Sequence, residues 1–179
     1  MSRRIAIAGA IATVVCWTLA AGTAVAGERG CARAAATADD TTLQQAADAV
    51  ICLVNGERTS RGLAPLRSSR QLARSARSHS RDMVARRYFS HISLGGTSPR
   101  QRVARSGYGR SSKVGETIAW GTGVLATPAE LVRSFMTSPG HRRILLDRGY
   151  RDVGIGLVLG APVADMGEGA TLTLDFARR

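Results

Sequence analysis

The chain has 179 residues and a formal net charge of +12 at pH 7, with Lys113 as the only lysine among its 25 basic residues. This length predicts a single domain with a real hydrophobic core. The charge favours contact with anionic wall polymers or lipid head groups. Nucleic acid is not expected as a partner, because the sequence has no zinc-finger spacing, helix-turn-helix pattern or aromatic-rich platform. The arginines are scattered, so a solvated cationic surface is the simpler interpretation.

The first residues, 1–26, have the pattern of a secretory signal peptide. Arg3 and Arg4 form a positive start, an uncharged run rich in Ala, Val and Ile follows, and Ala24-Val25-Ala26 is a small-x-small cleavage site. Cleavage after Ala26 predicts a secreted, extracellular protein that is not an integral membrane protein. An uncleaved membrane anchor is the alternative, because the apolar run is long enough to span a bilayer.

Two cysteines remain after this cleavage, Cys31 and Cys52. An even number in an oxidising compartment predicts one disulfide, worth about 3 kcal/mol in the chain-entropy model. It would join residues 27–41, a polar and alanine-rich tail, to the first helix. Two free thiols are the alternative. Lipid attachment is not expected, because neither Cys16 nor Cys31 follows the apolar and small residues that it needs.

The rest of the chain, residues 42–179, is predicted to form one domain that begins with helices. Apolar residues at i, i+3, i+4 and i+7 predict one helix over residues 42–60 and a second over residues 69–87. His79 lies on the apolar stripe of the second helix. A core histidine with a satisfied hydrogen bond is the simplest interpretation, and the pattern leaves open whether His79 reaches a cleft.

Shorter elements are predicted in the middle of the chain. A helix is expected over residues 98–105, with proline at its first position, and an extended segment over residues 114–121. Thr127 is a helix N-cap, and Glu130 is placed to complete a capping box. The sequence Ser138-Pro139-Gly140 is expected to stop that helix.

Two segments of period-two alternation end the chain, over residues 153–160 and 171–176. They predict half-buried strands in an antiparallel hairpin. Gly154 and Gly156 in the first segment indicate that a helix or a neighbouring strand packs closely against it. Helices followed by strands predict an α+β domain with a helix-covered antiparallel sheet.

The familiar catalytic signatures are missing: there is no G-x-S-x-G elbow, no H-E-x-x-H, no phosphate loop and no G-x-G-x-x-G. Three other segments each place one candidate histidine or glutamate beside small residues at the expected edge of an element. They are Tyr88-Phe89-Ser90-His91, Gly115-Glu116-Thr117-Ile118-Ala119 and Ser138-Pro139-Gly140-His141-Arg142-Arg143-Ile144-Leu145. Two imidazoles and a carboxylate that meet in a cleft can hold a divalent cation or transfer protons. His91, Glu116 and His141 are therefore the candidate site.

The order of these motifs resembles the bacterial branch of the CAP superfamily, named for cysteine-rich secretory, antigen 5 and pathogenesis-related 1 proteins. Leu53-Val54-Asn55-x-Glu57-Arg58, followed by Gly62-Leu63-x-Pro65-Leu66, is similar to the start of that domain. The resemblance covers about residues 45–177. It implies a three-layer α-β-α sandwich with a central antiparallel sheet, and a surface cleft lined by two histidines and acidic residues. On this sequence those positions are His91, His141 and Glu116.

The sequence departs from that family's pattern in the cleft. Many relatives have a second cleft glutamate, three residues after a tryptophan in the helix before the second histidine. Here Phe135 matches the tryptophan and Ser138 stands in place of the glutamate, so Ser138, like His79, is a weaker cleft candidate. Thr117 replaces the asparagine of the usual Gly-Glu-Asn. A site for zinc or another divalent cation would therefore have three protein ligands at best.

Members of that superfamily bind sterols, lipids, metals or other proteins, so the fold alone does not decide the function. The resemblance implies a secreted binding or interaction module at the cell envelope, with an anionic cell-wall polymer or lipid as the partner. The alternative is a metal-dependent hydrolase of peptides or esters, in which zinc on the two histidines activates a water and Glu116 serves as base or ligand. A purely structural role for the three residues is a third possibility. No catalytic residue is assigned.

Overall fold

The computed structural model describes residues 30–37, 43–164, 166 and 168–179. The predicted signal peptide, residues 1–26, lies outside them. The helices are α1 (Leu43–Thr59), α2 (Arg70–Arg86), α3 (Pro99–Arg105), α4 (Pro128–Thr137) and α5 (Pro139–Leu145), with the 3-10 helix η2 (Gly123–Ala126). The strands are β1 (Arg67–Ser68), β2 (Lys113–Thr122), β3 (Asp152–Leu159) and β4 (Gly169–Arg178).

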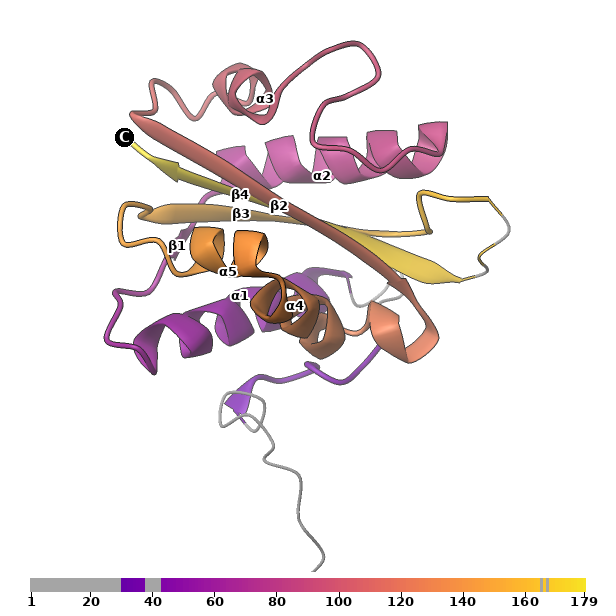
Figure 1. The fold of residues 1–179 in the computed structure, drawn as a ribbon, viewed down its shortest axis with the longest axis horizontal. Helices are drawn as coiled ribbons and strands as arrows, with labels where there is room; N and C mark the ends of the chain where they lie inside the picture. The colour runs from indigo at the N-terminus through magenta and orange to yellow at the C-terminus, as the bar shows by residue number, and fades with distance from the viewer. Residues whose placement is uncertain (1–29, 38–42, 165, 167) are drawn as a thin grey trace, which may run out of the picture.

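The described residues form three layers. Helices α2 and α3 cover one face of the sheet, and α1, α4 and α5 cover the other (Figure 1). This arrangement confirms the predicted α-β-α sandwich. Within the described residues, no helix combines the length and the apolar composition needed to cross a membrane.

The sheet has the strand order β1-β3-β4-β2. Strand β4 pairs with β3 and β2 in antiparallel register, which confirms the predicted hairpin. Strand β1 is parallel to β3, and its two residues are too few to show a periodic pattern in the sequence. The antiparallel expectation therefore holds for three of the strands. Strands β2 and β3 lie on opposite sides of β4, so their outer edges face away from each other.

Helix α2 packs directly on β3 at two glycines. A Cβ atom on Gly154 would lie 2.0 Å from the backbone carbon of Leu72, and one on Gly156 would lie 2.2 Å from that of Ala76. No side chain fits in such a space. The close approach predicted from the sequence is therefore made by α2, and the even-numbered residues of β3 face this helix.

Strand β4 is buried on both faces, which corrects the expectation of half-buried strands. Leu172, Leu174 and Phe176 lie in the core, and the alternating Thr171, Thr173 and Asp175 are equally buried. The reason is the second helical layer. A period-two pattern separates apolar from polar residues, but it does not show that helices also cover the polar face.

The N-terminal ends of the helices are capped by side chains close in the sequence. Ser69, Ser98 and Thr127 cap α2, α3 and α4 as their side chains accept backbone N–H groups in the first turn. At α4 the predicted capping box is incomplete, because the Glu130 carboxylate pairs with an arginine one turn later. The sequence Ser138-Pro139-Gly140 does end α4, but it also begins α5, since proline fits the first turn of a helix.

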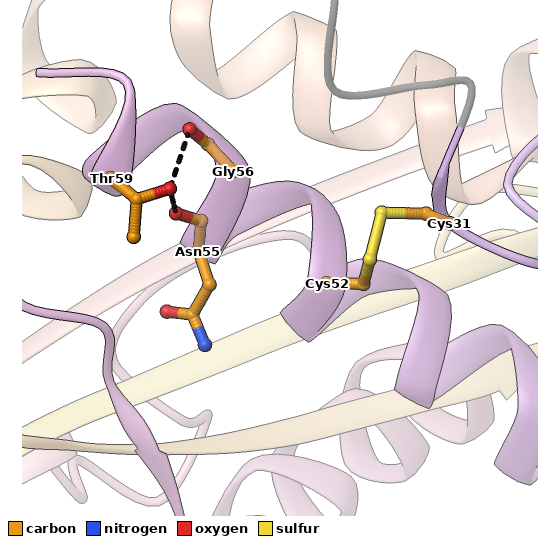
Figure 2. The surroundings of a disulfide bond; sticks show 5 residues. All are labelled: Cys31, Cys52, Asn55, Gly56 and Thr59. Atoms are coloured by element: carbon orange, nitrogen blue, oxygen red, sulfur yellow. Dashed lines mark hydrogen bonds between the residues drawn. A yellow bond between two sulfur atoms is a disulfide. The ribbon is translucent and has the colours of Figure 1, made fainter.

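The disulfide predicted between Cys31 and Cys52 is present, with a Cα–Cα distance of 5.7 Å (Figure 2). It joins residues 30–37 to α1. A main-chain hydrogen bond from Ala129 to Ala34 of 2.9 Å adds a contact with α4. Cys31 and Ala34 are buried in the main apolar cluster. This part of the N-terminal segment therefore packs on the α1–α4 layer.

We expect Gly156→Ala to destabilise the domain by about 2 kcal/mol, because the added methyl group would overlap the backbone of α2. Gly95→Ala is the matched control, since a Cβ there meets nothing within 4 Å. Urea unfolding followed by circular dichroism measures both. Equal stability of the two variants would show that α2 can move away from β3 without cost.

Candidate functional site

A buried carboxylate is the centre of the candidate site. The side chain of Glu116 on β2 is 1% exposed, and both of its oxygens are engaged. Oε1 lies 2.7 Å from Nδ1 of His91, and Oε2 accepts a hydrogen bond of 2.5 Å from Nη2 of Arg102. Nε2 of His79 is 3.9 Å from Oε1. The structure thus surrounds one acid with a guanidinium and two imidazoles.

The layer of α2 and α3 supplies these partners. Glu116 lies opposite Asp175 of β4, which in turn lies opposite Gly154, the residue that touches α2, so all three positions face this layer. Arg87 ends α2 in the left-handed conformation, at φ 53° and ψ 53°, and the chain then turns back toward β2. His91 reaches Glu116 from this loop.

Arg102 also fixes the loop that carries His91. Its guanidinium donates to the carbonyl oxygens of His91 at 2.9 Å and Thr97 at 2.8 Å, and to the hydroxyl of Ser93 at 3.2 Å. The residue is 9% exposed. The sequence did not identify Arg102, because nothing in the pattern of α3 separates it from the other arginines of this basic chain.

His141 meets His91 from the other layer. It lies in the first turn of α5, and the centroids of the two imidazole rings are 6.5 Å apart. The ring of Phe135 lies 5.2 Å from that of His141 in an edge-on arrangement. Burial, and then the proximity of His91, lower the pKa of His141. Ser138, the weaker candidate, takes the N-cap position of α5 without a capping hydrogen bond from its side chain.

The three candidates come from three kinds of element, and only Glu116 departs from the element edge that the sequence suggested. His91 is in a loop, Glu116 is inside a strand and His141 is in a helix. The contact between His91 and Glu116 is a direct hydrogen bond, whereas His91 and His141 are neighbours without one. The candidate site therefore lies where both helical layers meet the outer edge of β2.

His79 is a core residue, as its place on the apolar stripe predicts, and it lies directly behind Glu116. It is 1% exposed, and its Nε2 is 2.9 Å from the carbonyl oxygen of Ser90. Its Nδ1 is buried without a hydrogen-bond partner. Burial lowers the pKa of His79, while the negative charge of Glu116 opposes that effect. His79 therefore supports the site from the interior.

Asp175 is a second buried acid that the sequence did not single out. It is fully buried opposite Glu116, and neither of its carboxyl oxygens has a hydrogen-bond partner. Burial raises the pKa of Asp175 well above its ordinary value, and the negative charge of Glu116 raises it further. The period-two pattern assigned this residue to a polar strand face, and only the cover of α2 over that face reveals the burial.

The arrangement does not fit a divalent ion held through Glu116. Both oxygens of this carboxylate already have partners, and one of them is the positive guanidinium of Arg102. A cation placed there would lie beside that fixed positive charge. In the part of the chain that the structure describes, no group of three His, Cys, Asp or Glu side chains is arranged to hold a metal ion.

The contact between His91 and Glu116 has a clear chemical consequence. A carboxylate at Nδ1 favours the tautomer that carries its proton there, so Nε2 becomes the acceptor. The imidazole of His91 is 47% exposed, and the carboxylate that orients it is buried. The site can therefore accept a hydrogen bond, or a proton, from a polar group that enters from solvent.

The structure thus combines a three-layer α-β-α sandwich with two histidines, His79 and His91, around a buried glutamate, and His141 lies close to His91. Residues 51–165, more than half of the chain, match the family model CAP: Cysteine-rich secretory protein family. The chain belongs to this family, in agreement with the resemblance found in the sequence.

Two proteins of one bacterium are similar to this chain in sequence. The uncharacterized protein YkwD of Bacillus subtilis is 35% identical over 144 residues, which are 75% of this chain and 54% of that protein. The uncharacterized membrane protein YlbC of the same organism is 34% identical over 108 residues, which are 60% of this chain and 30% of that protein. The chain therefore spans about half or less of these relatives.

Two solved structures share the fold. An extracellular protein containing a SCP domain from Bacillus anthracis has a TM-score of 0.63 and 27% identity, over 79% of this chain and 41% of that chain. An outer surface protein from Borrelia burgdorferi has a TM-score of 0.62 and 20% identity, over 73% of this chain and 90% of that chain. At this level of identity, the second comparison concerns the fold alone.

Replacing Asp175 with Asn should increase thermal stability at pH 8 more than at pH 5. The pKa of Asp175 is raised in the folded state, so folding is opposed as the pH rises above the pKa of the unfolded chain, and a neutral amide removes that cost. Thermal unfolding of both proteins across this pH range is the measurement. A loss of stability that is equal at both pH values would contradict the assignment.

The His79→Gln variant tests a pH dependence of the opposite sign, in which stability is lost as the pH falls. The lowered pKa of His79 means that the unfolded chain binds a proton below about pH 6.5 that the folded chain rejects. The native protein should therefore lose stability from this source as the pH falls from 7.5 to 5. The variant, which can keep the contact with Ser90, should show a shallower decrease. Parallel curves for the two proteins would refute this role.

Proposed function

We propose that this chain is a secreted binding module of the cell envelope, with a ligand site at His91 and His141 over the outer edge of β2. The observation that carries the proposal is the 2.7 Å contact between an exposed imidazole and a buried carboxylate. Burying a charged or polar pair costs stability unless further hydrogen bonds replace the water that the groups lose. A histidine held in one orientation toward solvent is what a polar ligand requires.

The surroundings favour a ligand that carries both hydroxyl groups and negative charge. Nε2 of His91 can accept a hydrogen bond from a hydroxyl group, and the lowered pKa of His141 keeps its ring neutral. Arg142 and Arg143, which follow His141 on α5, are exposed. Together with the net charge, +12 for the full chain and +10 without Arg3 and Arg4 of the signal peptide, they favour an anionic, hydroxyl-bearing wall polymer such as a polyol phosphate.

Export is the other part of this proposal. The signal-peptide pattern of residues 1–26 supports it, as does the extracellular protein from Bacillus anthracis that shares the fold. The disulfide between Cys31 and Cys52 is the kind of bond that persists in an oxidising compartment.

The metal-dependent hydrolase is the weaker candidate for the same cleft. In that reaction Glu116 would bind the metal or take a proton from its water. Here Arg102 is hydrogen-bonded to Oε2 of Glu116 and places a positive charge next to it, and His91 occupies Oε1. Both effects oppose the two roles, so we assign Glu116 the part of orienting His91.

The test is titration of the secreted protein with a synthetic glycerol phosphate oligomer, followed by calorimetry. The double variant His91→Gln, His141→Gln should weaken binding roughly tenfold, equivalent to about 1.4 kcal/mol. Arg110→Gln, which removes an exposed charge on another loop, should change the affinity little. Unchanged binding by the histidine variant would show that general surface charge, and not the cleft, captures the polymer.

A further inference from the structure

Among the residues that the structure describes, none pairs with the outer edge of β3 along most of its length, on the side of the sheet opposite β2. Strand β1 pairs only with Asp152 and Val153. The Val153 carbonyl accepts from Ser69, and the N–H of Gly160 donates to Gly169 of β4. The main-chain N–H and C=O groups of successive strand residues point to opposite sides of the strand. Those of the even-numbered residues of β3 therefore point toward β4, and those of the odd-numbered residues point outward, away from β4.

Ile155 and Leu157 are two of these outward residues, and both lie beyond the part of β3 that pairs with β1. Within the described part of the chain, no strand pairs with their outward N–H and C=O groups. Unpaired main-chain groups at a sheet edge are a template on which another extended segment can pair.

A groove runs along this edge between α1 and α2. It consists of two adjoining hollows of about 460 and 580 Å³, which share Gln44, Ala47 and Arg77 in their linings. Both hollows are also lined by residues of β3, between Val153 and Leu159. We call this feature the β3-edge groove.

The two walls of the β3-edge groove differ in chemistry. The α2 wall carries four exposed arginines at i, i+4, i+7 and i+11, namely Arg70, Arg74, Arg77 and Arg81. Arg74 donates to the carbonyl oxygen of Ser106, but no described carboxylate pairs with the other three. The α1 wall contributes mainly apolar or small residues, with Gln44 and Asp48 joined to each other.

We propose that the β3-edge groove binds an extended acidic segment of a partner protein, which adds a strand to β3. Side chains of an added strand point alternately to the two faces of the sheet. Residues facing α2 would be glutamate or aspartate, opposite the unpaired arginines. Residues facing α1 would be small and apolar, opposite Ala47 and Ile51.

The structure favours a peptide over other anionic partners for a specific reason. A wall polymer or an anionic membrane satisfies the arginines, but it lacks N–H and C=O groups at the regular spacing that pairs with those of Ile155 and Leu157. A peptide backbone satisfies both. The available edge, Ile155 to Leu159, matches about five residues of partner, roughly 17 Å at 3.3 Å per residue.

A labelled octapeptide of alternating glutamate and alanine is the probe, and fluorescence anisotropy measures its binding to the full secreted protein. Arg77→Glu with Arg81→Glu should weaken binding at least tenfold. Arg110→Glu with Arg148→Glu makes the same change of charge at exposed positions outside the groove and should weaken it less than threefold. Circular dichroism checks that both variants fold.

Two peptide controls separate strand addition from attraction of charge. N-methylation of alternate residues removes the N–H groups that would pair with β3 and should cost at least tenfold in affinity. A peptide with the same composition in two blocks, four glutamates and then four alanines, should also bind more weakly. Equal binding by either control peptide overturns the proposal.

Amide hydrogen exchange supplies a direct readout. Adding the alternating peptide should slow exchange at Ile155 and Leu157, while Gly156 and Val158, which already face β4, change little. Several results reject the proposal: no slowing, equal losses in the two arginine variants, or no peptide binding while a glycerol phosphate oligomer binds through Arg77.

Discussion

The burial of the Glu116 carboxylate is the constraint on which the site depends. An ionised acid is costly to bury unless charged and hydrogen-bonding partners replace its water. Arg102 and His91 do so on this chain, from α3 and from the loop that follows α2. Because the same guanidinium also holds carbonyl oxygens of that loop, the position of His91 follows from the need to compensate Glu116.

This compensation is incomplete on the interior side. Asp175 and His79 lie next to Glu116 without cations of their own. Burial raises the pKa of Asp175 and lowers that of His79, and both shifts favour the neutral form of the side chain. A cluster of this kind adds little to stability compared with apolar packing of the same volume. What it provides is a fixed orientation for the exposed imidazole, which is a property of a binding site more than of a core.

The layered architecture explains why binding features lie at the two edges of the sheet. Helices cover both faces, and α2 is in direct contact with β3 at Gly154 and Gly156, so neither face is accessible. At the β2 edge the two helical layers approach each other and bring His91 and His141 together. At the β3 edge the layers stay apart and leave a groove with one basic wall.

The sequence by itself determined the features that depend on neighbours close in the chain. It predicted the helix starts near Ser69 and Ser98, the cap at Thr127, the final hairpin, the family and the order of the three site motifs. A cap or a hairpin is decided within a few residues, so its signal is local. The cysteine count, taken with the expected cleavage after Ala26, predicted the disulfide, because that cleavage would leave two cysteines to pair. Tertiary structure alone decided that Arg102 compensates Glu116 and that Asp175 is buried, since these depend on distant segments that meet over one strand.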